Sequence, residues 1–341
     1  MKVLFYTLLF LTLLLPTHLL ANPLERKLIH LVEQESDRPF SGVVLVAIKN
    51  VPVVAFAKGV ANRETQEPMT LKHQFQIGAL SQQQIAAIAL QQIDMGLLAL
   101  DQPINSFSEH YPESWQKVTI RQLLSHTSGI VSSAEAPVFE PGSQFRYSDF
   151  GYQLLGEVVS TAAGSSVGAL TEKLYQQCQM SRSLAPVNLL NRAVQPMLAR
   201  GYNETEQRSF VVAETLPLRQ MASGGLISDA FDLAKWNQCL HHGQLLSDSS
   251  YQQMVSVSSG PFAGQKAIGY GYGLQMASPE GVKEYSHSGY ISGYVSTMAY
   301  YPEQQMSLVI LENTAWSIGD TARAFRLHDR LRNVVVAAQA E

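Results

Sequence analysis

Strand-like runs stand near both ends of this chain, and a long helical stretch lies between them. Near the start, the runs SGVVLVAI and VPVVAFAKG are rich in β-branched residues and meet at Lys49-Asn50, which predicts a hairpin. Strand patterns return only near the end, as YGYGLQM, KEYSHSG, YVSTMAYYP and MSLVILEN. Strands from both ends can pair into one antiparallel sheet with the middle of the chain folded beside it. The order predicts an α+β fold of two subdomains with a cleft at their junction.

Helix signals dominate the middle of the chain. The segment LSQQQIAAIALQQIDMG ends at Gly96, a natural C-cap, and Thr119 can N-cap a helix that closes at Gly129. The segments SDFGYQLLGEVVSTAAG and SDAFDLAKWNQCLHHG each begin with Ser-Asp and end at glycine. Amphipathic patterns add a helix at each end, PLERKLIHLVEQE and 320–338. We therefore place a sheet subdomain at about 22–78 and 268–341, and a mostly helical insert at about 79–267.

The composition fits a packed globular protein and argues against nucleic acid as a partner. Of the 341 residues, 46% are hydrophobic, enough for a sizeable core. Charged residues make up only 15%, against roughly 25% in an average domain. The formal net charge is -4 and no basic block stands out, so the chain lacks the electrostatic signature of a nucleic-acid-binding protein.

The N-terminal segment MKVLFYTLLFLTLLLPTHLLAN has the organisation of a secretory signal peptide. Lys2 supplies the positive start, an apolar run covers 3–15, and Ala21 is a small residue before a cleavage point at Asn22. A membrane anchor is the alternative, but the run is shorter than the ~20 apolar residues that a membrane span needs. We expect residues 1–21 to be removed, and the protein to be periplasmic or secreted without a stable membrane anchor.

The chain has two cysteines, Cys178 and Cys239. In an oxidising compartment they could form one disulfide. The interpretation that we favour from the sequence is two small buried residues on separate helices. His241 and His242 precede Gly243, which suits a solvated loop better than a pair of metal ligands. The sequence therefore predicts no metal site and gives no sign of a cofactor.

Six segments, in order from about Phe40 to Asn313, carry a resemblance to a known family. They are FSGVVLVAIKN, LLALDQPINSF, VTIRQLLSHTSGI, FEPGSQFRYSDFGYQLLGEVV, ASGGLISDAFDLAKW and HSGYISGYVSTMAYYPEQ. Together they resemble the serine β-lactamase and penicillin-binding-protein group, in particular its class C-like, D-aminopeptidase and esterase branch. The resemblance implies the β-lactamase/DD-peptidase-like fold, an antiparallel sheet flanked by helices with a helical insert.

The resemblance also implies where an active site would lie. In the family, a Ser-x-x-Lys motif opens the first insert helix, where the serine attacks a carbonyl and the lysine on the same helix face takes its proton. A Tyr-x-Asn motif supplies a phenol and an amide, and a Lys-Thr-Gly or His-x-Gly strand forms the far wall. Two backbone N–H groups bind the oxyanion. The matching residues are Ala79 and Gln82 for the first motif, Tyr147 and Asp149 for the second, His287, Ser288 and Gly289 for the wall, and Ala79 and Tyr290 for the N–H pair.

Three of these positions depart from the family pattern. Ala79 and Gln82 replace the nucleophile and the lysine, and Asp149 replaces a neutral amide with an acid. Without a nearby ammonium, the Tyr147 phenol should keep its proton. No neighbour restores the pair, because Ser81 lies about 200° around the helix from position 79 and has Gln84 three residues later. We expect Gln82 to point into the cleft and Ser81 to point away.

Three functional hypotheses follow. We favour an exported pseudoenzyme that binds a peptide, an amide, a cell-wall-related ligand or a protein partner. The second hypothesis is a working peptidase, esterase or β-lactamase type of hydrolase with a non-standard site, in which Tyr147 and His287 remain and His287 or Asp149 activates water. The third is a scaffold with a vestigial cleft. Loss of the nucleophile weighs against the second, because it can cost ~10⁶ in rate.

Overall fold

The computed structural model describes residues 22–35, 38–133, 135–186, 195–214, 216–243, 245–260, 267–316 and 320–339. The predicted signal peptide, 1–21, lies outside these ranges. Within them, no helix combines the length and the apolar character that crossing a membrane would require.

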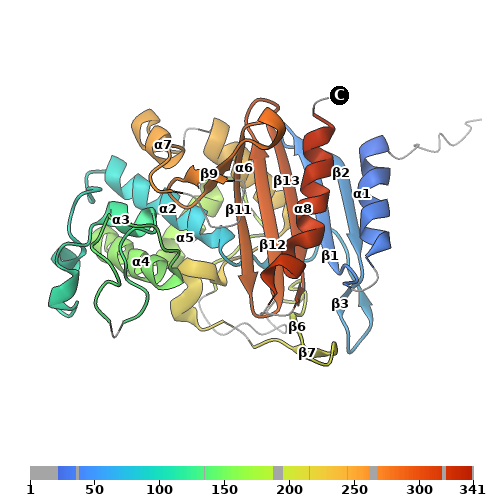
Figure 1. Cartoon of the computed structure of the whole chain (residues 1–341), viewed down its shortest axis with the longest axis horizontal. Helices are drawn as coiled ribbons and strands as arrows, with labels where there is room; N and C mark the ends of the chain where they lie inside the picture. Colours follow the sequence, from blue (N-terminus) through green and yellow to red (C-terminus); the bar gives the residue numbers. More distant parts are fainter. Residues whose placement is uncertain are drawn as a thin grey trace, which may run out of the picture.

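A seven-stranded antiparallel sheet joins the two ends of the chain, as predicted (Figure 1). The strand order is β2-β1-β13-β12-β11-β10-β9, and Gly42 of β1 pairs with Glu312 of β13. The run YGYGLQM does not form one strand, because Gly273, at φ +73°, turns the chain between β9 and β10. The strands are β1 (Gly42–Ile48), β2 (Val51–Lys58), β9 (Ala267–Tyr270), β10 (Gln275–Ala277), β11 (Glu284–Ile291), β12 (Tyr294–Tyr301) and β13 (Met306–Glu312).

Both faces of the sheet are covered. Side chains alternate along β1, so Val44 and Val46 face one side, and Val43 and Leu45 face the other. The first side packs on α1 (Pro23–Gln34) and α8 (Thr321–Ala337), which run side by side over the sheet in Figure 1. The second side belongs to the main core, which it shares with the helical region. Burial on both faces explains why β13 is apolar at nearly every position.

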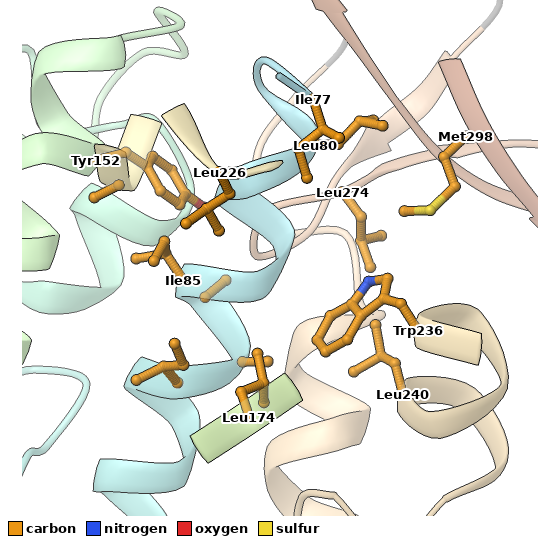
Figure 2. Close-up of a cluster of buried hydrophobic side chains, with 14 of the residues drawn as sticks. Ile77, Leu80, Ile85, Tyr152, Leu174, Leu226, Trp236, Leu240, Leu274 and Met298 are labelled. Carbon is orange, nitrogen blue, oxygen red and sulfur yellow. The ribbon is translucent and has the colours of Figure 1, made fainter. Parts of the chain in front are cut away.

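The helical region lies beside the sheet and is built around α2 (Figure 1). Figure 2 shows Tyr152 on one side of α2 and Trp236, Leu274 and Met298 on the other. The remaining helices are α3 (Ile120–Leu124), α4 (Asp149–Ala163), α5 (Val167–Gln177), α6 (Ala230–His242) and α7 (Asp248–Met254). Short strands complete the fold: β3 (Val60–Asn62), β4 (Glu67–Pro68), β5 (Phe75–Gln76), β6 (Tyr202–Glu204), β7 (Phe210–Val212), β8 (Ile227–Ser228) and β14 (Thr314–Ala315).

Helix α2 (Leu80–Asp94) is buried all round, although it carries three consecutive glutamines. Two of them receive hydrogen bonds from other helices: the Trp236 indole donates to Gln83 Oε1 at 2.5 Å and the Tyr175 hydroxyl donates to Gln84 Oε1 at 2.8 Å. Buried amides need such partners, because an unpaired polar group costs about 1–3 kcal/mol. The third glutamine, Gln82, points toward the cavity described below.

The helix predicted between Thr119 and Gly129 is shorter than expected. Thr119 and Gln122 form a capping box, and the helix ends at Leu124. The chain leaves the helix because His126 adopts a left-handed conformation with φ +56°. This turn directs the His126 ring toward the end of the sheet, where it contacts Tyr270.

The cysteines are joined, which corrects the interpretation that they are separate buried residues. Cys178 follows α5, Cys239 lies in α6, and the two form a disulfide with their Cα atoms 5.4 Å apart. Their separation of 61 residues in sequence conceals this proximity. The turn after α5 is bound to α6, since Lys235 Nζ donates to the Gln179 carbonyl at 2.9 Å.

The prediction of a loop at His241-His242 was wrong, although His242 is exposed to solvent as expected. Both residues lie in the last turn of α6. The His241 ring stacks on Tyr300 at 4.4 Å with an angle of 6° between the rings, and its Nδ1 is 3.0 Å from the Tyr251 hydroxyl. Burial of the ring lowers the pKa of His241 to about 3, so this partly buried imidazole is neutral.

Candidate functional site

A cavity of about 380 Å³ lies where the helical region meets β11. Strand β11 contributes His287, Ser288 and Tyr290, and α8 contributes Phe325. From the helical region come Ala79, Tyr147, Asp149, Gln153, Leu216, Gln220, Ser223 and Gly224. The sequence-predicted residues Ala79, Tyr147, Asp149, His287, Ser288 and Tyr290 thus line one space, at the junction where the cleft was expected.

Close backbone approach brings the start of α2 against β11. Gly78 has φ +56°, and a Cβ there would stand 3.1 Å from the Gly289 Cα and 3.5 Å from the Tyr290 nitrogen. A Cβ on Gly289 would stand 2.9 Å from the Ala79 nitrogen. Two glycines therefore face each other and bring the amides of Ala79 and Tyr290 close together. Both residues line the cavity, so this geometry suits the binding of a carbonyl oxygen by two N–H donors.

Gln82 lies behind the cavity wall and does not line the cavity. Its side chain is fully buried, and Nε2 donates to the Tyr147 hydroxyl at 2.5 Å and to Asp149 Oδ1 at 3.0 Å. The Tyr147 hydroxyl itself donates to Asp149 Oδ1 at 3.0 Å. Gln82 therefore points toward the cleft as expected, but it does not contact the cavity itself and reaches it only through Tyr147 and Asp149.

Burial sets the protonation of this group of three residues. Burial raises the pKa of Tyr147 well above its usual value, and the neighbouring Asp149 carboxylate raises it further. Burial also raises the pKa of Asp149, against the lowering effect of the hydrogen bonds from Tyr147 and Gln82. The hydrogen bond from Gln82 lowers the pKa of Tyr147 by less than burial and Asp149 raise it, so the phenol is a neutral hydrogen-bond donor.

A second buried chain of hydrogen bonds ties the Tyr147 segment to β11. The Ser148 N–H donates to His126 Nδ1 at 3.2 Å, and His126 Nε2 is 3.2 Å from the Tyr270 hydroxyl. That hydroxyl is 3.0 Å from His287 Nε2, and His287 Nδ1 is 2.9 Å from the Ser288 carbonyl. The Ser148 N–H can only donate and the Ser288 carbonyl can only accept. Each group between them therefore donates its proton in the direction of β11.

Both histidines in this series of hydrogen bonds, His126 and His287, are neutral. Burial lowers the pKa of His287 to about 4, against a raising effect of the hydrogen bond to the Ser288 carbonyl. Burial, and then the neighbouring His287, hold the pKa of His126 well below its usual value. Each neutral ring has one donor and one acceptor, and both positions are used. His287 therefore has no free nitrogen with which to accept a proton from a substrate or from water.

Neither Ser81 nor Ser148 takes the place of a nucleophile at position 79. Ser81 is fully buried, does not line the cavity, and accepts a hydrogen bond from the Leu226 N–H at 3.3 Å, so it points away as expected. Ser148 is the N-cap of α4 and donates to the Ile130 carbonyl at 2.6 Å. Within the described ranges, no group of three or more histidine, cysteine and acidic residues is placed to hold a metal ion.

Sequence reasoning missed several residues of the site. Tyr270 connects the two histidines, and Phe325 of α8 forms part of the cavity lining. Tyr270 belongs to a run that reads as one strand, and Phe325 lies on an ordinary amphipathic helix. Their role comes from tertiary packing, which brings the Tyr270 hydroxyl to His287 and the Phe325 ring to Tyr290, and no local pattern indicates it.

Comparison with known proteins gives relatives along most of the chain. Penicillin-binding protein 4* of Bacillus subtilis (strain 168) is 23% identical over 80% of this chain and 68% of its own length. A D-aminopeptidase of Brucella anthropi is 22% identical over 84% of this chain. The match spans 58% of the aminopeptidase, so more than a third of that protein has no counterpart here.

Solved structures share the fold. The D-amino acid amidase from Ochrobactrum anthropi SV3, complexed with D-phenylalanine, superposes with a TM-score of 0.80 at 20% identity, over 93% of this chain and 100% of that chain. The octameric penicillin-binding protein homologue from Pyrococcus abyssi gives 0.74 at 24% identity, over 85% of this chain and 72% of that chain. The Beta-lactamase family profile matches residues 26–332. The chain therefore belongs to the β-lactamase family, with the β-lactamase/penicillin-binding-protein fold.

Proposed function

We propose that this protein is an exported member of the family that binds a peptide, an amide or a related carbonyl ligand in the cavity without forming an acyl-enzyme. The observation that carries the proposal is the pair of residues at the start of α2. Ala79 presents a methyl group to the cavity, and Gln82 places an amide against Tyr147 and Asp149. A methyl group cannot attack a carbonyl, and an amide has no basic lone pair for a proton.

Binding does not need the missing side chain. The amides of Ala79 and Tyr290 belong to the backbone and remain beside each other. A pair of such donors is worth roughly 2.7–4 kcal/mol toward a developing oxyanion and less toward a neutral carbonyl. Weak binding of a carbonyl compound is the role that this geometry supports best.

The alternative of a water-activating hydrolase has less support. His287 uses both ring nitrogens within the protein. Asp149 has a raised pKa, but its Oδ1 accepts hydrogen bonds from both Gln82 and Tyr147, and those bonds oppose the rise. The scaffold alternative remains distinct, because it predicts that replacing cavity residues changes no function of the protein.

Export is supported by two independent features of the chain. The first is the signal-peptide pattern of residues 1–21. The second is the disulfide between Cys178 and Cys239, since structural disulfides persist in oxidising compartments such as the periplasm or the extracellular space.

Intact-mass measurement tests the absence of acylation. We expect no mass gain after long incubation of the purified protein with benzylpenicillin or with a serine-directed fluorophosphonate. A stoichiometric gain that maps to a cavity serine, Ser223 or Ser288, would overturn the proposal.

Matched variants show whether the cavity itself is intact. The Ala79→Ser variant should stay unreactive, because no base is placed beside the new hydroxyl. The triple variant Ala79→Ser, Gln82→Lys, Asp149→Asn restores the family pattern and should gain an adduct at position 79. If the triple variant folds and still does not react, features beyond these three positions have been lost.

A further inference from the structure

A buried relay of hydrogen bonds reaches the cavity at Ser288. The Ser288 and Thr297 hydroxyl oxygens, on the neighbouring strands β11 and β12, are 3.3 Å apart. Thr297 Oγ1 is 2.8 Å from His328 Nδ1, and His328 Nε2 is 2.8 Å from Glu312 Oε1. Of these four residues only Ser288 lines the cavity. The relay therefore connects the cavity with groups that a ligand in it does not touch.

The far end of the relay is a buried ion pair. Arg38 NH2 donates to Glu312 Oε1 at 2.5 Å, and both side chains are fully buried. His328 and Thr297 are only 1% and 3% exposed. Taking charges out of water costs free energy that the attraction between them offsets only in part, so a buried ion pair is weak evidence for stability. Its connection to the cavity points instead to a role in binding.

The protons of the relay can be counted from its charged end. Burial would raise the pKa of Glu312, but Arg38 and the hydrogen bond from His328 outweigh burial and the pKa is lowered, so Glu312 is a carboxylate. Burial lowers the pKa of His328 despite the opposing effect of Glu312, so the ring is neutral. Its one proton must lie on Nε2, because a carboxylate only accepts.

The proton positions make Ser288 a hydrogen-bond donor to Thr297. His328 Nδ1 carries no proton and must accept the Thr297 proton. Thr297 then has none left for Ser288, so in the contact between the two hydroxyls Ser288 is the donor. The Ser288 proton is thereby used inside the protein, and only oxygen lone pairs remain for a ligand. Ser288 therefore meets the cavity as an acceptor.

We propose that Thr297 and His328 are specificity-determining residues, although neither lines the cavity. They hold Ser288 as an acceptor, so the cavity favours a ligand that offers Ser288 an N–H or O–H donor over a matched ligand that offers only lone pairs. This inference rests on the proposed binding role and adds the residues that set its hydrogen-bond polarity. A serine alone has no such preference, because a hydroxyl with a free proton can donate or accept.

Strand geometry places this acceptor near a backbone donor of the site. Ser288 precedes Tyr290 by two residues on β11, which separates their Cα atoms by about 6.7 Å. A short peptide or amide can therefore present a carbonyl to the Tyr290 N–H and an N–H group to Ser288. The two contacts are complementary, since β11 offers a donor at one and an acceptor at the other.

Two matched probes test the inference by calorimetry or ligand-observed NMR. N-acetylleucine methylamide has an N–H group where N-acetylleucine methyl ester has an oxygen. Both are neutral and nearly equal in size, and each is tested as both enantiomers on the naturally processed protein. We expect the methylamide to bind about tenfold more tightly. Because the amide carbonyl is also the better acceptor, the decisive quantity is the change in this ratio between variants.

Thr297→Val keeps the shape of the side chain but removes its hydroxyl. The Ser288 proton is then released and can turn toward the ester oxygen, so we expect the ratio to fall about fivefold, mainly through tighter binding of the ester. Thr297→Ser keeps the hydroxyl and should keep the ratio. In the Ser288→Ala background, Thr297→Val should change the ratio by less than about twofold, because Thr297 acts only through Ser288.

The proton positions can also be measured in the unmodified protein, which decides the question if Thr297→Val does not fold. The ¹H–¹⁵N NMR signals of His328, assigned with a His328→Gln variant, should show a neutral ring with its proton on Nε2 at neutral pH. A proton on Nδ1, or on both nitrogens, would let Thr297 donate to Ser288 and would overturn the inference.

The outcomes separate this inference from the proposed function. If both probes bind and Thr297→Val leaves their ratio unchanged, the cavity binds carbonyl compounds but the relay does not set its specificity. A fall of the ratio that persists in the Ser288→Ala background also overturns the inference, because Thr297 would then act through the fold and not through Ser288. If neither probe binds, the proposed function fails and the inference fails with it.

Discussion

Gln82 illustrates how one substitution changes the chemistry of its neighbours. A lysine at this place would put a cation beside the Tyr147 hydroxyl and favour its ionisation. The amide of Gln82 donates hydrogen bonds but carries no charge. Tyr147 therefore keeps its proton and donates a hydrogen bond to Asp149. The residues still form one connected group, but Gln82 gives it hydrogen bonds without the positive charge that would favour a phenolate at Tyr147.

The protonation of His287 provides a prediction at the residue scale. Burial lowers its pKa to about 4, below the usual value of ~6.5. We therefore expect the His287 ring to stay neutral, with its proton on Nδ1, when the pH falls from 7 to 5. Histidine ¹H–¹⁵N NMR, assigned with a His287→Gln variant, measures this, and exposed His110 gives an internal reference. Protonation of His287 near pH 6.5 would contradict the hydrogen-bond directions given for this site.

The same shift has a consequence for stability. Between pH ~6.5 and ~4 the unfolded chain binds a proton at this histidine that the folded protein does not bind. The free energy of unfolding is thus unaffected by this group above pH ~6.5. Below pH ~6.5, the free energy of unfolding falls by about 1.4 kcal/mol for each pH unit until His287 of the folded protein is also protonated. In His287→Gln this part of the acid dependence should disappear.

At the scale of elements, the junction between β5 and α2 depends on Gly78. Gly78→Ala should cost the energy of a left-handed alanine, about 1–2 kcal/mol, and in addition push Gly289 and Tyr290 away. Gly96→Ala is the matched control, because Gly96 also has a positive φ, +73°, but a Cβ there meets nothing within 4 Å. Chemical denaturation gives the free energy of unfolding of both variants. The difference between their losses is the cost of the contact between the new Cβ at position 78 and β11. Equal losses would mean that the close approach to β11 is not important for stability.

The secondary structure follows from local signals to a large extent. Asn22, Ser148 and Asp229 accept hydrogen bonds from the first turns of α1, α4 and α6, and the Lys49-Asn50 hairpin has two positive φ values. Contacts between elements are different. The disulfide was not predicted, because the meeting of α5 with α6 depends on packing, and His241 looked solvated because its aromatic neighbours lie on distant strands.

The disulfide links the end of α5 to α6, which are separated in sequence by a segment that includes β6, β7 and β8. In the chain-entropy account, closing a loop of 61 residues stabilises the fold by about 4 kcal/mol. The double variant Cys178→Ala, Cys239→Ala should lose stability of that order in denaturant unfolding, and leave the cavity able to bind ligand. Alkylation of the unfolded, unreduced protein should modify no thiol. A loss below about 1 kcal/mol would show that the helix contacts alone hold this region.

For the whole molecule, the candidate site is a meeting of segments that are far apart in sequence. Family motifs indicate which residues of α2, the Tyr147 segment and β11 come together. They do not indicate that the relay through Thr297, His328 and Glu312 ends at the cavity, because its members come from β12, α8 and β13 and have no shared spacing. The electrostatic character of the cavity therefore emerges only when the sheet and α8 are in place.

The last prediction concerns where the protein acts. Helix α1 begins at Pro23, with the Asn22 side chain as its cap, so a cleavage before Asn22 would leave the folded part intact. Oxidation of Cys178 and Cys239 would then follow export. We expect mass spectrometry of the protein from an expressing bacterium's periplasm or medium to show residues 22–341 with two hydrogens fewer than the reduced chain. A protein that stays in the cytoplasm with its leader and two free thiols would contradict export, and would place the disulfide in doubt as a feature of the working molecule.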